Sequence, residues 1–176
     1  MTRLAAMAAV LLMAAACGDD SATPTTPSGN TGPIVLTASL SAANEVPPVT
    51  NADANARGLV TVTLNVPRSG SGAVTGAGTA DFVAQLTSFP ARSPLTLAHL
   101  HAGAAGATGT VVINTNLSAV SPLVTDANGA GTLNVTGIAI SQADATSIAA
   151  SPSSFYFDVH STLNATGAIR GQLVRQ

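Results

Sequence analysis

Beyond residue 33, the apolar residues of this 176-residue chain fall in short runs rich in threonine and valine, separated by glycine, proline, asparagine and aspartate. Runs of this length and composition are typical of β-strands, and the residues between them are typical of turns. Because the links are short, we expect antiparallel pairing in one all-β domain, either an immunoglobulin-like sandwich or a barrel. The predicted strands cover residues 34–42, 59–66, 78–86, 97–102, 110–117, 131–137, 155–161 and 168–175.

One segment departs from this strand-like composition. The tetrapeptide Ser141-Gln-Ala-Asp144 resembles a helix capping box, and an alanine-rich stretch continues from it to Ala150, just before Pro152. We therefore expect one short helix over this stretch.

Alternation within residues 155–161 separates apolar from polar side chains, because successive side chains of a strand point to opposite faces of the sheet. One face of this strand is predicted to carry Phe155, Phe157 and Val159, and the other to carry Tyr156, Asp158 and His160.

The last predicted strand, residues 168–175, alternates in the same way and is expected to pair with residues 155–161. Making the two apolar faces coincide predicts Phe157 opposite Leu173 and His160 opposite Arg170. A guanidinium beside His160 would favour the neutral imidazole, unless both groups share Asp158 as a partner.

All three histidines lie in two of the predicted strands. His99 and His101 project from one face with Cα atoms about 6.5 to 7 Å apart, a spacing from which both imidazoles can bind one metal ion. His160 is the predicted third ligand, and imidazole ligands suit copper or zinc. Asp158 and Glu45, the only glutamate, are candidates for a fourth ligand or for acceptors that support the ligands. Structural hydrogen bonds from the histidines to loop backbone are the alternative.

The charge balance excludes several classes of function. Six arginines, no lysine and eight acidic residues give a net charge of −2, so no basic face is available to bind nucleic acid. The absence of lysine excludes a P-loop and a Schiff base to pyridoxal phosphate. No Gly-x-Ser-x-Gly motif occurs. We recognise no catalytic site and favour a protein that is not an enzyme.

The N-terminus predicts export. Arg3 precedes an apolar run over residues 4–16, which is too short to span a membrane and is typical of a signal peptide over residues 1–16. The sole cysteine, Cys17, follows at once and resembles the lipidated first residue of a bacterial lipoprotein. The alternative is an ordinary signal peptide followed by a free thiol. We expect lipidated Cys17 and a flexible tether over residues 17–33, with the domain at 34–176 held to a membrane in the cell envelope or periplasm.

Four separated segments resemble, in order, the motifs of the CHRD domain, the chordin-type domain that is also widespread in exported bacterial proteins. These segments are Leu40–Pro48, His99–Gly109, Phe157–Ser161 and Gly167–Leu173. The resemblance implies an immunoglobulin-like sandwich or barrel. Asp158, Ser161 and Ala168 stand where the family usually has asparagine, threonine and an acidic residue. The motif residues for which we expect a structural role are Glu45, Pro47, Pro48, Gly103, Arg170, Gly171 and Gln172.

Two functions are compatible with these features. The first is a non-catalytic binding or structural module tethered by lipid, with an unknown protein or envelope partner, in which Glu45 and Arg170 tie a loop to a strand. The second is a mononuclear copper or zinc protein that uses His99, His101 and His160. The His-x-His spacing resembles copper-zinc superoxide dismutase, but that enzyme's dinuclear site needs more histidines than this chain has. A shared metal site requires ligand nitrogens within about 4 to 5 Å of one another.

Overall fold

A computed structural model describes residues 31–176. The predicted signal peptide, Cys17 and the tether up to residue 30 lie outside the described residues. No helix within the described part of the chain is long and apolar enough to cross a membrane.

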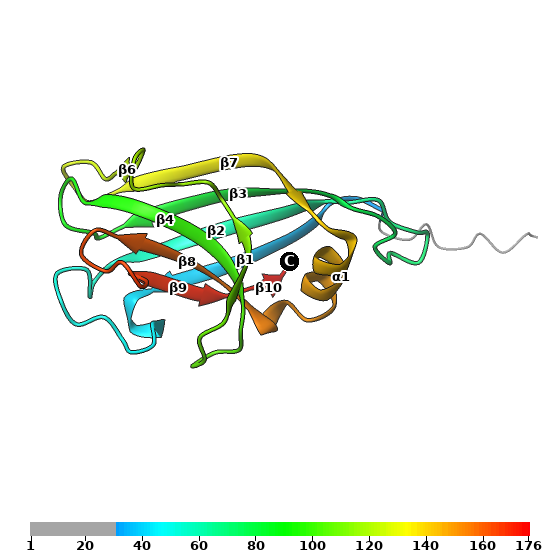
Figure 1. The fold of residues 1–176 in the computed structure, drawn as a ribbon, viewed down its shortest axis with the longest axis horizontal. Coiled ribbons are helices and arrows are strands. Elements are labelled where there is room, and N and C mark those ends of the chain that lie inside the picture. The colour runs from blue at the N-terminus through cyan, green and yellow to red at the C-terminus, as the bar shows by residue number, and fades with distance from the viewer. Residues whose placement is uncertain (1–30) are drawn as a thin grey trace, which may run out of the picture.

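The described chain forms one antiparallel, nearly closed, barrel-like sheet (Figure 1). Its main path runs β5-β4-β8-β9-β1-β2-β3-β7, while β10 pairs with β1 and β6 pairs with β4. The strands are β1 Ile34–Ser41, β2 Arg57–Asn65, β3 Gly78–Thr87, β4 Pro94–Ala102, β5 Thr110–Asn114, β6 Leu123–Val124, β7 Gly131–Ile140, β8 Phe155–Ser161, β9 Ile169–Gln172 and β10 Val174–Arg175. Two short 3-10 helices are also present. η1 Ala42–Asn44 follows β1, and η2 Pro152–Ser154 directly precedes β8.

The all-β fold is confirmed, and each predicted strand has a counterpart, although β5 ends at Asn114 instead of residue 117, β4 begins at Pro94 and β7 continues to Ile140. Two further differences concern the number of strands. The predicted strand 168–175 is divided at Leu173 into β9 and β10, and Leu123–Val124 adds β6. A strand of two residues has no alternation to reveal it, which explains why β6 was missed.

The predicted helix is also confirmed, as α1 Gln142–Ala150. The Ser141 hydroxyl accepts a hydrogen bond from the Asp144 backbone N–H, as a capping residue should. Ala145 and Ile148 are the buried residues of this helix. In Figure 1, α1 lies at one end of the sheet beside β10, and the Arg175 side chain donates to the Ala149 carbonyl there.

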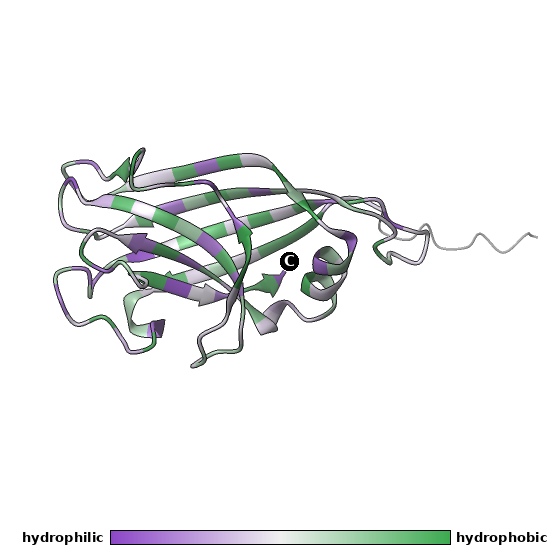
Figure 2. Ribbon diagram, viewed as in Figure 1, coloured by the Kyte–Doolittle hydropathy of each residue, from purple (hydrophilic) through white to green (hydrophobic). Residues whose placement is uncertain are grey.

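The core lies inside the curved sheet because apolar and polar residues alternate along the strands (Figure 2). Phe82 of β3 and Phe157 of β8 stack across the interior with ring centroids 5.6 Å apart, although their strands are not neighbours. Ala98 and Leu100 of β4 are fully buried in the same core. The opposite face of β4 and β8 is therefore the face that carries the histidines.

The predicted register of the last two strands is wrong by two residues. Phe157 lies opposite Gly171, and Asp158, not His160, lies opposite Arg170. A slip of two residues keeps every side chain on its predicted face, so alternation alone does not fix it. The packing of β9 on its other neighbour, β1, is close: a Cβ on Gly171 would lie 2.1 Å from the Ser39 carbonyl oxygen, so the glycine is needed where β9 meets β1.

Candidate metal centre

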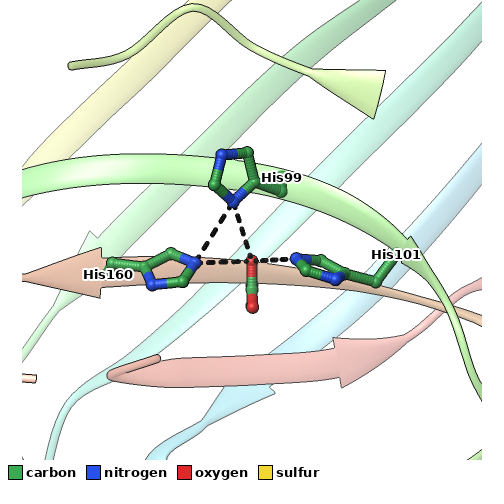
Figure 3. A group of neighbouring side chains, drawn as sticks. His99, His101 and His160 are labelled. Carbon is green, nitrogen blue, oxygen red and sulfur yellow. Dashed lines mark hydrogen bonds and ion pairs between the residues drawn. The ribbon is translucent and has the colours of Figure 1, made fainter. Parts of the chain in front are cut away.

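The pairing of β4 with β8 brings the three histidines to one patch. His99 lies opposite Asp158, and His160 lies opposite Leu97 on the same strand as His99. Both predicted alternations are confirmed, because Ala98 and Leu100 face the core while His99 and His101 share the other face with Asp158 and His160. Figure 3 shows the three imidazoles converging from β4 and β8.

The four side chains are close enough to share one ion. One ligand atom from each of His99, His101, Asp158 and His160 lies within 4.8 Å of the others. His101 Nε2 and His160 Nε2 each lie 3.3 Å from Asp158 Oδ1. His99 Nδ1 lies 3.9 Å from the same oxygen and 3.2 Å from His160 Nε2. The predicted convergence of the imidazoles is confirmed, while their role as ligands stays a prediction.

Loop carbonyls orient two of the imidazoles. His101 Nδ1 lies 2.9 Å from the Gly109 carbonyl oxygen, and His160 Nδ1 lies 3.0 Å from that of Ala165. A carbonyl can only accept, so each Nδ1 carries a proton, and in the neutral imidazole the lone pair of Nε2 faces the centre of the cluster. This is how ligands of metal ions are commonly held in place.

Two atoms at the centre of the histidine cluster have no hydrogen-bond partner among the described residues. Within the described residues, Asp158 Oδ1 and His101 Nε2 are buried and make no hydrogen bond, since their 3.3 Å approach lacks hydrogen-bond geometry. A buried carboxylate oxygen without a donor is costly. A cation at the centre would satisfy both atoms.

Burial and charge shift the pKa values of this cluster in different directions. Burial lowers the pKa of His99; the Asp158 charge opposes this shift, and the neighbouring imidazoles reinforce it. Burial also acts to lower the pKa values of His101 and His160, but the Asp158 carboxylate outweighs it and both are raised. For Asp158, burial acts to raise the pKa, yet the two imidazoles hold it below its usual value. The carboxylate is thus the negative centre of the cluster.

Tyr156, the only tyrosine, is a member of the site that sequence reasoning did not single out. Its ring stacks on His101 with centroids 4.9 Å apart and planes 7° apart, and the Arg170 guanidinium carbon lies 4.6 Å from the Tyr156 centroid. The Gly109 N–H donates to the Tyr156 hydroxyl at 3.2 Å. Alternation places Tyr156 on the same polar face as Asp158 and His160, and this is the sequence feature that could have identified it as part of the site.

Glu45 and Arg170 tie a loop to a strand, as expected. Arg170 Nε donates to the Asn44 carbonyl at 2.6 Å and lies 3.9 Å from Glu45 Oε2, while Nη1 donates to the Ala107 carbonyl at 2.9 Å. Glu45 is not one of the four clustered side chains. Burial, and next the Asp158 charge, raises the pKa of Glu45 to about 7. Arg170 therefore pairs with Glu45 and with backbone carbonyls. It does not lie opposite His160, where the predicted register would have had it favour the neutral imidazole.

The remaining motif residues close the loops around this patch. Gln172 donates to the carbonyls of Gly103 and Ser153 at 3.0 and 2.7 Å. Gly103 packs so closely on Tyr156 that a Cβ would lie 2.9 Å from the ring. Pro47, which follows a cis peptide bond, and Pro48 shape the loop after Glu45.

Comparison with known proteins agrees with the motif resemblance. The family model described as the CHRD domain matches residues 36–173. No curated protein and no solved structure matches the chain. The family match spans β1 to Leu173 and includes all four clustered side chains. The chain belongs to the CHRD domain family.

Proposed function

We propose that this CHRD domain is a non-catalytic module that binds one copper or zinc ion through His99, His101 and His160, with Asp158 as the fourth ligand. The observation that carries the proposal is the buried, unpartnered pair of Asp158 Oδ1 and His101 Nε2 at the point where the imidazoles converge. Hydrogen bonding alone leaves these atoms unsatisfied, and a metal ion satisfies them.

The donor set fits these two metals. Three imidazoles and one carboxylate suit zinc in a tetrahedral site and also suit copper(II), whereas the cluster has no thiolate. In the neutral imidazoles of His101 and His160, the carbonyls of Gly109 and Ala165 hold the proton on Nδ1 and direct Nε2 inward. Metal binding displaces protons from imidazoles, so affinity is expected to fall at acidic pH.

We also propose the cell envelope as the setting, with the domain anchored by lipid at Cys17. The support is the order of Arg3, the short apolar run 4–16 and Cys17, followed by a tether without large apolar residues. An extracytoplasmic module of this kind would meet oxidised copper more readily than a cytoplasmic protein.

The decisive experiment measures metal content and binding on protein purified without a histidine tag. The purified protein should retain or take up one equivalent of copper or zinc. His101→Ala should lose it, and Asn134→Ala, an exposed residue of β7 at the far end of the sheet order, should retain it. If the unmutated protein takes up no stoichiometric metal, the proposal is wrong.

Tyr156 offers a second readout in the same samples. The chain has one tyrosine and no tryptophan, and that tyrosine stacks on a proposed ligand. Copper(II) should therefore quench the intrinsic fluorescence in a saturable way in the unmutated protein and in Asn134→Ala. Quenching that persists in His101→Ala would contradict binding at this site.

A further inference from the structure

Asp53 is the most deeply buried acidic residue of the described chain, with none of its surface exposed, although it lies in the loop between η1 and β2. Its Oδ2 atom accepts two short hydrogen bonds, each 2.6 Å long, from the Ser161 hydroxyl and the Asn164 side-chain amide. Within residues 31–176 its Oδ1 atom is buried and has no hydrogen-bond partner. Burying a half-satisfied carboxylate is costly, so we expect its two short bonds to hold something that the domain needs.

The two partners of Asp53 lie at the end of β8 and in the loop that joins β8 to β9. Ser161 directly follows His160 in the chain. Asn164 directly precedes Ala165, whose carbonyl oxygen lies 3.0 Å from His160 Nδ1. Asp53 therefore holds the chain on both sides of the contact between a proposed metal ligand and the carbonyl that orients it.

Other hydrogen bonds close the β8–β9 loop or lie nearer the surface. The N–H groups of Ser161 and Gly167 both donate to the Asn164 carbonyl at 3.2 Å, within the loop. The side chains of Asn164 and the exposed Asn51 exchange two bonds of 2.8 and 3.1 Å. Asn51 also accepts from the Asp53 N–H at 3.1 Å. Asp53 is thus the buried centre of the contacts between the η1–β2 loop and the β8–β9 loop.

The place of the proton on neutral His160 decides whether this side chain can bind a metal ion. Two acceptors compete for that proton: the Ala165 carbonyl at Nδ1, and Asp158 Oδ1, which lies 3.3 Å from Nε2. A carboxylate is the stronger acceptor of the two. A proton on Nε2 would occupy the atom that faces the centre of the cluster and prevent it from acting as a ligand. The Ala165 carbonyl must therefore be held firmly at Nδ1.

We propose that Asp53 is a positioning residue of the metal centre, which holds the Ala165 carbonyl against His160 and so keeps the proton on Nδ1. Asp53 is not one of the four clustered side chains and acts through the β8–β9 loop. The inference deepens the proposed function and rests on it for the metal. The position of the proton is measurable in metal-free protein, so the two proposals can fail separately.

The first measurement locates the proton by NMR of the full chain with isotope-labelled histidine, in EDTA at about pH 9, where neutral imidazole predominates. The shifts and couplings of the ring nitrogens show which one carries the proton. In the unmutated protein, His101 and His160 should both carry it on Nδ1. Asp53→Ala should move the His160 proton toward Nε2. It should leave His101 unchanged, because the partner of His101 Nδ1 is Gly109, in a different loop.

Further variants separate positioning from a general loss of stability. Asp53→Asn keeps an oxygen that can accept from Ser161 and Asn164, so it should restore the unmutated His160 signal. Asn164→Ala removes one of the two bonds and should shift the His160 proton in the same direction by less, which provides the test even if Asp53→Ala does not fold. Asp126→Ala is the matched control, because Asp126 also holds a loop by accepting two hydrogen bonds, but between β6 and β7. It should shift neither proton.

Zinc affinity is the second readout. Asp53→Ala should bind zinc about 10- to 100-fold more weakly, the usual effect of losing a group that supports a ligand, whereas Asp53→Asn and Asp126→Ala should match the unmutated protein. An unmoved His160 proton in Asp53→Ala and Asn164→Ala, an equal change at His101, or an unchanged zinc affinity in Asp53→Ala would each overturn the proposal. If the unmutated protein binds no zinc while the His160 proton moves as expected, the metal function is wrong and the control of this proton by Asp53 stands.

Discussion

Asp158 lies directly opposite Arg170 in the β8–β9 pair, yet it directs its carboxylate toward the histidines rather than toward the guanidinium. Arg170 instead pairs with Glu45 and with two loop carbonyls. The carboxylate is thus left as the negative partner of three imidazoles. This division of charges is what makes the cluster suited to a cation.

Replacing Asp158 with asparagine should weaken metal binding. The substitution keeps the shape of the side chain and removes the charge. We expect an affinity loss of about 10- to 100-fold, the usual effect of losing a carboxylate that ligates or supports a metal site. Titration with copper(II), followed by Tyr156 fluorescence, measures it.

Asn134→Ala serves as the control for this comparison, because Asn134 is exposed on β7, where it pairs with Val83 of β3, and it is not one of the four clustered side chains. Equal affinities for the unmutated protein and Asp158→Asn would show that the carboxylate takes no part in binding.

Glu45 should make the stability of the metal-free protein depend on pH. Its pKa is raised from 4.5 to about 7 in the folded state, so between these values the folded state binds a proton more tightly than the unfolded state. The stability contribution of Glu45 is therefore fully present below about pH 4.5 and is lost as the pH rises through about 7. Glu45→Gln removes the titrating carboxyl group, so the variant does not lose this stability as the pH rises. The Tm of Glu45→Gln, relative to the unmutated protein, should rise between about pH 5 and about pH 8.

Thermal unfolding in EDTA at several pH values provides the measurement. Asn134→Ala introduces no titratable change and should follow the unmutated protein in parallel at every pH. A Tm difference between Glu45→Gln and the unmutated protein that stays constant with pH would contradict the raised pKa.

The fold could be predicted because alternation and short links determine it locally. Alternation placed His99 and His101 on one face, and it placed Asp158 with His160 on another strand's polar face. It could not fix the register of β9 on β8, since a slip of two residues preserves every face. Alternation also does not reveal contacts between segments far apart in the sequence, such as the close approach of Gly171 in β9 to Ser39 in β1.

The supporting groups of the site were less predictable than the histidines. The carbonyls of Gly109 and Ala165 orient two imidazoles, but any residue type offers a carbonyl, so no sequence pattern marks them. The pairing of Arg170 with Glu45 depends on how the η1 loop folds back over β9. Loop conformation, rather than strand alternation, decides both.

Gly171→Ala should destabilise the domain. The added Cβ would lie 2.1 Å from the Ser39 carbonyl oxygen, and backbone on a neighbouring strand cannot move aside easily. We expect a loss of about 1–3 kcal/mol or more in the free energy of unfolding. Gly70→Ala is the matched control, because nothing lies within 4 Å of its added Cβ. Denaturant unfolding of both variants checks the expectation, and equal midpoints would contradict the close packing of β9 on β1.

Cys17 should determine where the protein resides. If Cys17 is lipidated, the unmutated protein will fractionate with membranes and carry a mass increase from its acyl chains, whereas Cys17→Ala will be found in the soluble fraction. Cell fractionation and mass spectrometry measure both effects. Ser21→Ala, in the same predicted tether, should leave the distribution unchanged. An unmodified Cys17 in membrane-free protein would favour the ordinary signal peptide instead.

Metal binding should raise the thermal stability of the domain. The ligands come from β4 and β8, which are neighbouring central strands, so the ion binds the folded arrangement and not the unfolded chain. At a free zinc concentration of about 100 times Kd, linkage predicts a stabilisation of about 2.7 kcal/mol. Scanning calorimetry with zinc, and again after EDTA, should show a Tm increase that reverses. The increase should vanish in His101→Ala but persist in Asn134→Ala; an equal increase in both variants would place the zinc elsewhere on the protein.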